Sequence, residues 1–141
     1  MTSHDVATER LRSFFETLTA TSPDRLAALY APTILVAGPH AALTISRDAL
    51  LGKVSERKQL LDSVGPHTTR LMACEETTLS ERYILARTIW QWDFEASAES
   101  VIVPSTFIVD NGGDLPQIIL YLLQTDVVSV LRERGLLPTA A

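Results

Sequence analysis

The stretch Arg82–Phe94, RYILARTIWQWDF, decides the fold. Large apolar side chains fall on its even-numbered positions and polar ones gather on its odd-numbered positions, which is the period of a β-strand with one buried face. The even set is Ile84, Ala86, Thr88, Trp90, Trp92 and Phe94, and the odd set includes Arg87, Gln91 and Asp93. At about 3.3 Å per residue this strand is roughly 40 Å long, whereas a domain of this size has a radius of gyration of roughly 14 Å. We therefore predict a strand that curves strongly, with its even-numbered side chains on the concave face.

Turn-forming residues divide the chain after His67 into a meander of four strands; they cluster at 77–80, 96–99 and 110–114. In the last cluster, Asn111–Gly112 is typical of a tight hairpin. Pro104 falls inside the third strand, where proline removes a hydrogen-bond donor, so we predict a β-bulge there. On the fourth strand, strict alternation predicts that Ile118, Leu120, Leu122 and Gln124 lie on the concave face. It predicts that Ile119, Tyr121 and Leu123 lie on the outer face.

Helical periodicity precedes these strands and returns after them. Apolar spacings of three and four predict helices over residues 4–20, 22–30 and 46–63, with short extended pieces at 33–37 and 41–45. In the third helix we expect Leu50, Leu51, Val54 and Leu61 to face inward and Glu56, Arg57 and Lys58 to face outward. A short last helix begins at Asp126 and ends at Gly135. The prediction is a single α+β domain over residues 1–141, in which a curved antiparallel sheet wraps around three helices as a cone with a pocket.

Composition limits the classes of partner. The chain has 141 residues, 46% of them apolar, and 12 Lys and Arg against 17 Asp and Glu give a net charge of -5. The few cations are scattered, so neither nucleic acid nor an acidic membrane surface is an expected partner. Short apolar runs, the lack of leader features in residues 1–25 and a single cysteine, Cys74, predict a cytoplasmic protein. Without a phosphate loop or metal-ligand spacing, we expect no cofactor and no metal.

Three further stretches carry a resemblance to a known superfamily. They are LAALYAP at residues 26–32, SRDAL at 46–50 and DVVSVLRERGLLP at 126–138. In this order around a four-strand meander they resemble the nuclear transport factor 2-like superfamily, which includes the SnoaL-like polyketide cyclases and the ketosteroid isomerases. The resemblance covers nearly the whole chain and implies a cystatin-like cone. Because the superfamily holds enzymes, binding proteins and assembly domains, it implies no single function.

The resemblance also locates the catalytic positions of these enzymes, and the residues found there do not transfer protons. The general-base position of ketosteroid isomerases falls on Gly38 and their oxyanion-stabilising tyrosine on Phe14. The second oxyanion donor falls on Ser105, near where SnoaL-like cyclases keep an acid/base aspartate; a serine hydroxyl can hydrogen-bond but does not transfer a proton near neutral pH. The Arg and Asp pair of limonene epoxide hydrolase-like members is not evident, because its nearest candidates, Arg87 and Asp93, are predicted to face outward. Isomerase chemistry of this type is therefore argued against.

Three side chains remain as candidate catalytic groups: His40, Tyr30 and Ser105. His40 follows Gly38–Pro39 near the expected mouth of the cone, and histidine exchanges protons near neutral pH; the simpler interpretation is an exposed turn histidine, and His67 is expected to be solvated. Trp90 and Trp92 offer either an aromatic floor for a flat ligand or plain core. The predicted pocket lining is Phe14, Phe15, Tyr30, Gly38, His40, Trp90, Trp92, Ser105, Phe107, Leu120 and Gln124.

Three functions are compatible with these residues. The leading one is binding of a small hydrophobic metabolite without the acid/base set of the known enzymes. The second is a SnoaL-like isomerase, cyclase or dehydratase acting on a polyketide-like or steroid-like substrate through His40, Tyr30 or Ser105. The third is an assembly domain whose pocket is filled by its own side chains. A homodimer is expected through an outer sheet face that is unusually apolar, with Tyr83, Leu85, Ile89, Ile119, Tyr121 and Leu123.

Overall fold

Six strands form one sheet in the order β2–β1–β6–β5–β4–β3. The structure, a computed structural model, describes residues 11–18, 23–39 and 41–138. The strands are β1 (Tyr30–Ala37), β2 (Ala42–Ser46), β3 (His67–Thr78), β4 (Tyr83–Phe94), β5 (Val101–Asp110) and β6 (Gln117–Leu123). All neighbours are antiparallel except β1 and β6, which are parallel. The meander predicted after His67 is confirmed, and the two extended pieces before it join the same sheet.

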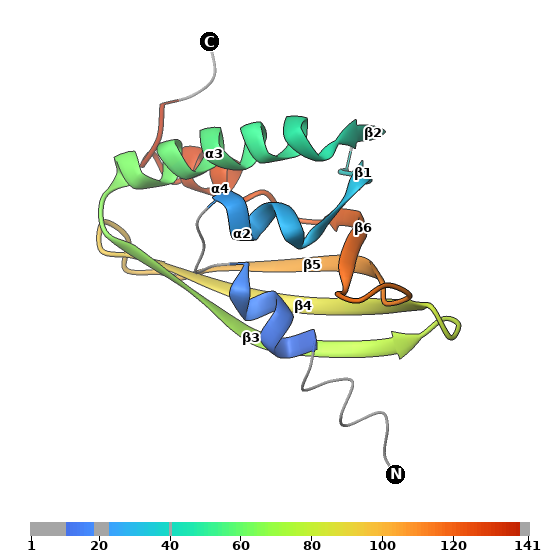
Figure 1. Cartoon of the computed structure of the whole chain (residues 1–141). Coiled ribbons are helices and arrows are strands. Elements are labelled where there is room, and N and C mark those ends of the chain that lie inside the picture. Colours follow the sequence, from blue (N-terminus) through green and yellow to red (C-terminus); the bar gives the residue numbers. More distant parts are fainter. Residues whose placement is uncertain (1–10, 19–22, 40, 139–141) are drawn as a thin grey trace.

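Four helical segments accompany the sheet. Residues 11–17 are helical, followed by α2 (Pro23–Ala28), α3 (Arg47–Val64) and α4 (Val127–Glu133). Figure 1 shows α2 and α3 lying over one face of the curved sheet, with the long strands β3, β4 and β5 beneath them. The predicted α+β architecture is therefore confirmed. The second helix is shorter than predicted, because the chain is already extended at Tyr30, the first residue of β1.

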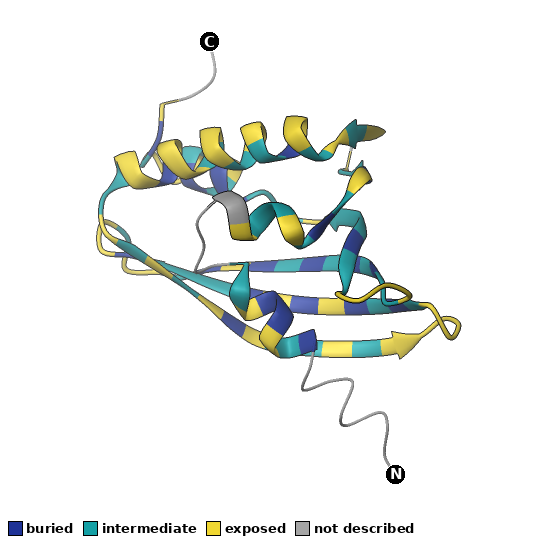
Figure 2. Ribbon diagram, viewed as in Figure 1, coloured by how far each residue is buried: buried dark blue, intermediate teal, exposed yellow. Residues whose placement is uncertain are grey.

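The bounds of α3 follow from its capping residues. The hydroxyl of Ser46 accepts a hydrogen bond from the Ala49 amide at 3.1 Å, and Asp48 places a carboxylate in the first turn, where the helix dipole favours it. The helix ends at Gly65, which adopts a φ of 119° that side chains disfavour. Only Leu50 and Leu61 are buried along this helix, and Figure 2 shows much of its outer side exposed. Thus α3 covers the sheet through a narrow apolar stripe.

The ladder between β4 and β5 is regular throughout. Every even-numbered residue from Ile84 to Phe94 is buried except Trp92, which is half-buried, and the concave face predicted for this strand is confirmed. The register passes Pro104 without a shift, in a pair with Ile89, so the bulge predicted there is wrong. β6 pairs with β5 only from Ser105 onward, and the missing N–H of Pro104 therefore removes no hydrogen bond to β6.

The bulges lie on β3 and β6 instead. On β6, Ile118 pairs with Val109 and Leu120 pairs with Ile108, which leaves Ile119 as the extra residue. One extra residue exchanges the two faces of a strand. The strict alternation predicted for β6 is therefore correct at Ile118, which is fully buried, and wrong beyond the bulge. Beyond it Tyr121 and Leu123 face the concave side, opposite to the prediction, whereas Leu120 and Leu122 face the convex side and Gln124 is exposed.

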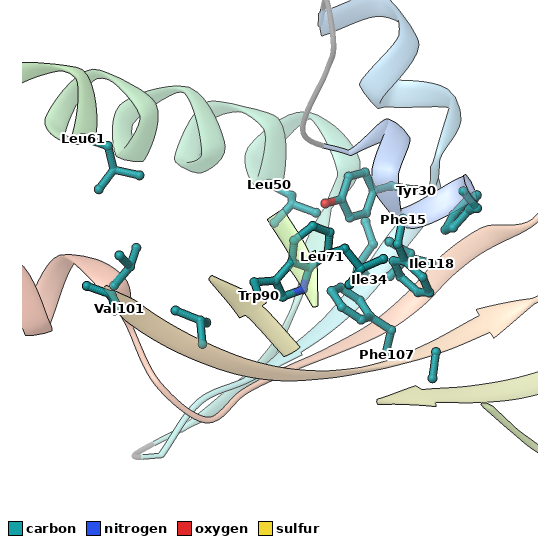
Figure 3. Packing of buried hydrophobic residues seen from close by; sticks show 14 of the residues in the cluster. Phe15, Tyr30, Ile34, Leu50, Leu61, Leu71, Trp90, Val101, Phe107 and Ile118 are labelled. Carbon is teal, nitrogen blue, oxygen red and sulfur yellow. The ribbon is translucent and has the colours of Figure 1, made fainter. Parts of the chain in front are cut away.

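Aromatic side chains occupy the centre of the core (Figure 3). The ring of Phe15 lies 5.2 Å from that of Phe14 and 4.8 Å from that of Phe107, measured between centroids. Phe107 stacks on Tyr121 at 4.9 Å. Because these rings come from the first helical segment, β5 and β6, their burial joins the helices to the concave face of the sheet.

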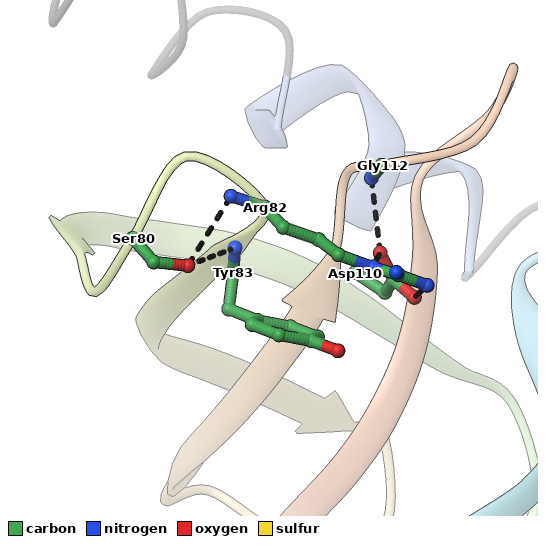
Figure 4. A network of polar contacts seen from close by, with 5 residues as sticks. All are labelled: Ser80, Arg82, Tyr83, Asp110 and Gly112. Carbon is green, nitrogen blue, oxygen red and sulfur yellow. Dashed lines mark hydrogen bonds and ion pairs between the residues drawn. The ribbon is translucent and has the colours of Figure 1, made fainter.

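A polar network holds the turns at one end of the long strands (Figure 4). The guanidinium of Arg82 donates to both carboxylate oxygens of Asp110, at 2.8 and 2.9 Å, and the Gly112 amide donates to the same carboxylate at 2.9 Å. The Ser80 hydroxyl accepts from the amides of Arg82 and Tyr83. The Arg82 hydrogen bond, followed by that from Gly112, lowers the pKa of Asp110. The network fixes the ends of β4 and β5 in register.

Candidate functional site

A cavity of about 360 Å³ lies between α3 and the concave face of the sheet. Pockets that hold small organic ligands begin at roughly 300 Å³. One wall belongs to α3, and the facing wall belongs to β4 and β5. The inward residues of β6, residues at both ends of β1 and the first residues of β3 also contribute to the lining, together with Leu18, Leu26, Thr125 and Val127. The two walls differ in chemistry and are described in turn.

The sheet wall is apolar and firmly held. Its lining residues are Trp90, Trp92, Val103, Ser105 and Phe107. The indole N–H of Trp90 donates to the Thr88 hydroxyl at 2.8 Å, and that hydroxyl donates to the Ser105 carbonyl at 3.0 Å. These hydrogen bonds satisfy the polar atom of the indole within the wall, so that Trp90 presents an apolar surface to the cavity.

One end of the sheet wall carries a stacked histidine. The ring of His67 stacks on those of Trp92 and Phe94 at interplanar angles of 28° and 30°, with centroid distances of 6.0 and 5.3 Å. Its Nδ1 lies 3.1 Å from the Gly65 carbonyl oxygen, and its Nε2 lies 3.7 Å from a carboxylate oxygen of Asp62. Because a carbonyl oxygen only accepts, the hydrogen bond to Gly65 places a proton on Nδ1. Contrary to the sequence expectation, His67 is half-buried and lines the cavity.

Tyr30 lies on the lining at the start of β1. Its side chain is buried, and Figure 3 shows its hydroxyl pointing toward the space beside Leu50 of α3. Burial raises the pKa of Tyr30 to about 12, with Tyr121 adding to this rise and Arg57 opposing it. At neutral pH Tyr30 therefore keeps its proton and acts as a hydrogen-bond donor. Because the phenolate form is scarcely populated, Tyr30 does not serve as a general base.

The helix wall carries all the charge of the lining. Its residues are Leu50, Lys53, Val54, Arg57, Lys58 and Leu61. Lys58 donates to the Asp62 carboxylate at 2.9 Å, and this hydrogen bond is the largest cause of the lowered pKa of Asp62. Among the described residues no aspartate or glutamate lines the cavity. The arrangement can bind an apolar body and an anion, and offers no carboxylate as acid or base.

The structure places the predicted pocket residues in three groups. Five line the cavity: Tyr30, Trp90, Trp92, Ser105 and Phe107. Five lie elsewhere, with Phe14 and Phe15 in the core, Gly38 in the turn between β1 and β2, Leu120 on the convex side and Gln124 exposed beyond β6. His40 lies outside the described residues. Of the candidate catalytic groups the structure thus brings Tyr30 and Ser105 to one cavity.

The pair considered for hydrolase chemistry faces the other way. Arg87 is exposed on the convex side of β4. Asp93 accepts hydrogen bonds from Ser100 and Gln91, which are the largest causes of its lowered pKa. Cys74 is half-buried, and burial raises the pKa of its thiol to about 11. None of these three groups lines the cavity.

The charged residues of the helix wall were missed by the sequence interpretation, which placed Arg57 and Lys58 on the outer side of the helix. A spacing signal for Arg57 exists, since Leu50, Val54, Arg57 and Leu61 recur at the intervals of one helix face. The prediction placed Arg57 outside because the side chain is charged. However, arginine can bury the aliphatic part of its side chain and keep the guanidinium at the edge of a pocket.

Two structural absences hold for the part of the chain that the structure describes. No helix there is long and apolar enough to cross a membrane. No group of three or more His, Cys, Asp or Glu within residues 11–18, 23–39 and 41–138 is arranged to hold a metal ion. The cytoplasmic location expected from the sequence stays a prediction.

No protein-family model and no curated protein matches this sequence. Solved structures do match. A nuclear transport factor 2-like protein of unknown function from Pseudomonas putida is 16% identical, with a TM-score of 0.68, and the alignment covers 86% of this chain and 88% of that one. A putative scytalone dehydratase from Novosphingobium aromaticivorans is 14% identical, with a TM-score of 0.64 and coverage of 90% and 89%. A putative calcium/calmodulin-dependent protein kinase II association domain from Xanthomonas campestris is 14% identical, with a TM-score of 0.62 and the same coverage.

These likenesses establish the fold. The chain has the nuclear transport factor 2-like fold that the sequence resemblance implied. The neighbours include a putative dehydratase, a putative association domain and a protein of unknown function, so the fold alone does not assign a function.

Proposed function

We propose that the protein binds a small hydrophobic molecule in the cavity between α3 and the sheet. The observation that carries this proposal is a cavity of about 360 Å³ whose sheet wall presents Trp90 and Phe107, with the polar atom of the indole already bonded inside the wall. An apolar ligand would gain dispersion contacts and release water there without breaking a hydrogen bond of the protein. The space left open also argues against a pocket filled by its own side chains.

The lining favours a flat ligand. Trp90 and Trp92 extend from the same face of β4, and Val103 of β5 lies beside them in register with Trp90. Aromatic rings favour offset-stacked or edge-to-face contacts with other rings. The hydroxyl groups of Ser105 and Tyr30 are among the uncharged polar groups of the lining that could orient such a ligand.

A second candidate function is an isomerisation, cyclisation or dehydration in the same cavity. It is favoured by the placement of Tyr30 and Ser105 on one lining and by the likeness to a putative scytalone dehydratase. Tyr30 would stabilise developing negative charge as a neutral donor, and Ser105 would orient the substrate. Turnover that survives Tyr30→Phe and Ser105→Ala would remove these two groups from any such reaction.

The binding proposal is tested by filling the cavity from the helix side. Titration with 1-nitronaphthalene, a flat uncharged quencher, should quench the tryptophan fluorescence of the wild-type protein to saturation. Val54 lines the cavity, so Val54→Phe should weaken the affinity at least about tenfold by occupying the ligand's space. Ser55→Phe adds the same ring to the exposed side of the same helix and should leave the affinity unchanged. Absence of saturable quenching, or equal affinities in all three proteins, would refute the proposal.

We further propose a homodimer through the convex face of the sheet. The six residues first predicted for this face need revision, since Tyr121 and Leu123 line the cavity and their places are taken by Leu120 and Leu122. Ile89 and Ile102 on this face are 40% and 49% exposed. Exposed apolar faces of this kind are often subunit contacts, and one structural neighbour is a putative association domain.

The dimer proposal is tested by sedimentation. Ile102→Arg should shift the protein from dimer to monomer, because it places a charge on this face. Leu43→Arg is the matched control: Leu43 is also 49% exposed but lies on β2, paired with the cavity residue Val36 and thus on the opposite side of the sheet. A monomeric wild-type protein would refute the dimer.

A further inference from the structure

Charge around the cavity is one-sided. The chain as a whole is acidic, with 17 Asp and Glu against 12 Lys and Arg. Nevertheless, the charged residues that line the cavity are Lys53, Arg57 and Lys58, all cationic and all from α3. The acidic residues of the same helix, Asp48, Glu56 and Asp62, are exposed and do not belong to the lining. The local charge is thus opposite in sign to the net charge of the protein.

Arg57 is the cation best placed to act on a ligand. It is half-buried, whereas Lys53 and Lys58 are exposed. It follows Val54 by one turn on the apolar stripe of α3. Lys58 already pairs with Asp62, but no aspartate or glutamate of the described residues pairs with Arg57. Half-buried Arg57 thus has no carboxylate partner among the described residues, and a bound anion would supply a counter-charge beside the apolar cavity.

Tyr30 stands on the lining near the same guanidinium. The charge of Arg57 is close enough to act against the rise that burial causes in the pKa of Tyr30. The tyrosine keeps its proton at neutral pH and can donate it in a hydrogen bond. A carboxylate between the two groups would receive charge-assisted hydrogen bonds from both, and guanidinium and carboxylate geometries match in pairs of parallel bonds.

We infer that the ligand is a flat aromatic or polycyclic carboxylic acid, whose carboxylate is held by Arg57 and Tyr30 while its rings lie against Trp90. This inference rests on the proposed ligand binding and adds the chemical class. The two walls then have separate tasks: the sheet wall receives the rings and the helix wall receives the acid. A neutral molecule of the same shape would leave the guanidinium without a counter-charge.

Two probes of nearly equal shape isolate the charge. Isothermal titration of the full-length protein at neutral pH compares 2-naphthoate, a carboxylate, with 2-naphthamide, its neutral counterpart. The wild-type protein should bind naphthoate at least about tenfold more tightly than naphthamide, the ratio expected for one hydrogen-bonded charge. Because the net charge of -5 repels anions in general, such a preference must arise locally.

Arg57→Gln should remove that preference. The affinity of this variant for naphthoate should fall to within about twofold of its affinity for naphthamide. Its affinity for naphthamide should equal that of the wild-type protein. Arg87→Gln is the matched control, since Arg87 is exposed on the convex side of the sheet and the substitution changes the net charge equally. Arg57→Lys keeps the charge but loses the pair of parallel hydrogen bonds, so this variant should lose part of the preference for naphthoate. If circular dichroism shows Arg57→Gln to be unfolded, Arg57→Lys takes its place in the test.

The outcomes separate this inference from the proposed function. Equal binding of the two probes to the wild-type protein, or a preference that survives Arg57→Gln, would overturn the inference and leave the ligand-binding cavity in place. An equal loss in Arg87→Gln would also overturn it, by showing that overall charge sets the preference. Binding of neither probe would overturn both.

Discussion

The two walls of the cavity are built in different ways. The sheet wall is held by the regular ladder between β4 and β5, and its rings belong to the core of the protein. The helix wall is one helix with only two buried residues, and its charged side chains reach past the apolar stripe to the cavity. Substitutions of the core residues of the sheet wall should therefore change the free energy of unfolding, whereas substitutions of the charged residues of the helix wall should change binding. Shape is set by one wall and charge by the other.

The largest effect is expected where the sheet wall is also core. Phe107 contacts Phe15 and Tyr121, and its side chain is 4% exposed. Phe107→Ala should lower the free energy of unfolding by about 3–5 kcal/mol, because it removes buried surface and leaves a void. Leu60 lies on the outer side of α3 and is 39% exposed, so Leu60→Ala should lower the free energy of unfolding by less than about 1 kcal/mol. Urea denaturation measures both, and equal losses would contradict the assignment of Phe107 to the core.

Tyr30, at the edge of the sheet wall, should give a pH-dependent effect of about 2–3 kcal/mol. Its folded pKa of about 12 lies above the unfolded value of 10.0, so the unfolded chain loses the proton first as the pH rises. This stabilisation is complete below pH 10 and is lost between pH 10 and about 12. Phenylalanine cannot ionise, so the difference in free energy of unfolding between the wild-type protein and Tyr30→Phe should shrink across this interval. Parallel pH profiles would show that Tyr30 is not buried as described.

A smaller effect is expected from the hydrogen bonds behind Trp90. Thr88→Val removes the acceptor of the indole N–H and one donor to the Ser105 carbonyl, and it leaves the indole N–H without its partner. The free energy of unfolding should fall by about 1–3 kcal/mol. Thr106→Val, a change of the same chemistry on the convex side of β5, should stay within about 0.5 kcal/mol. No difference between the two variants in thermal or urea denaturation would mean that water replaces the lost partners.

The smallest effect on stability is expected in the helix wall. Arg57→Gln should change the free energy of unfolding by less than about 0.5 kcal/mol, because no carboxylate of the described residues pairs with Arg57. The same denaturation experiment measures it, and the probe titrations give its effect on binding. A loss comparable to that of Thr88→Val would show that the guanidinium supports the fold rather than a ligand.

The sequence predicts β4 well and β6 poorly for a physical reason. In β4 all the charged residues and the one glutamine, Arg87, Gln91 and Asp93, fall on the odd-numbered face, so the face that must be buried is specified. β6 reads QIILYLL and is apolar on both faces, so neither alternation nor a glycine or proline marks the bulge at Ile119. The opposite error occurs at Pro104, where the proline signal is present but the β6 ladder ends beside it.

The sequence predicted the uncharged residues of the candidate site but not the charged ones. Trp90 follows from the alternation of β4, whereas Ser105 and Phe107 were placed in the pocket by the resemblance to the nuclear transport factor 2-like superfamily, and all three line the cavity. The charged residues of the site were missed because Arg57 was placed on the solvent side of the helix on account of its charge. It reaches the lining because α3 lies over the cavity. His67 was missed likewise, since its stacking on Trp92 depends on the pairing of β3 with β4.

The most direct test of the central claim is where a ligand lies. Intermolecular nuclear Overhauser effects should be measured on the labelled protein saturated with 2-naphthoate. The account predicts contacts from the naphthalene protons to the indole of Trp90 and to the methyl groups of Val54, one residue from each wall. Contacts to Ile102 on the convex face, or none to either wall at saturation, would contradict it.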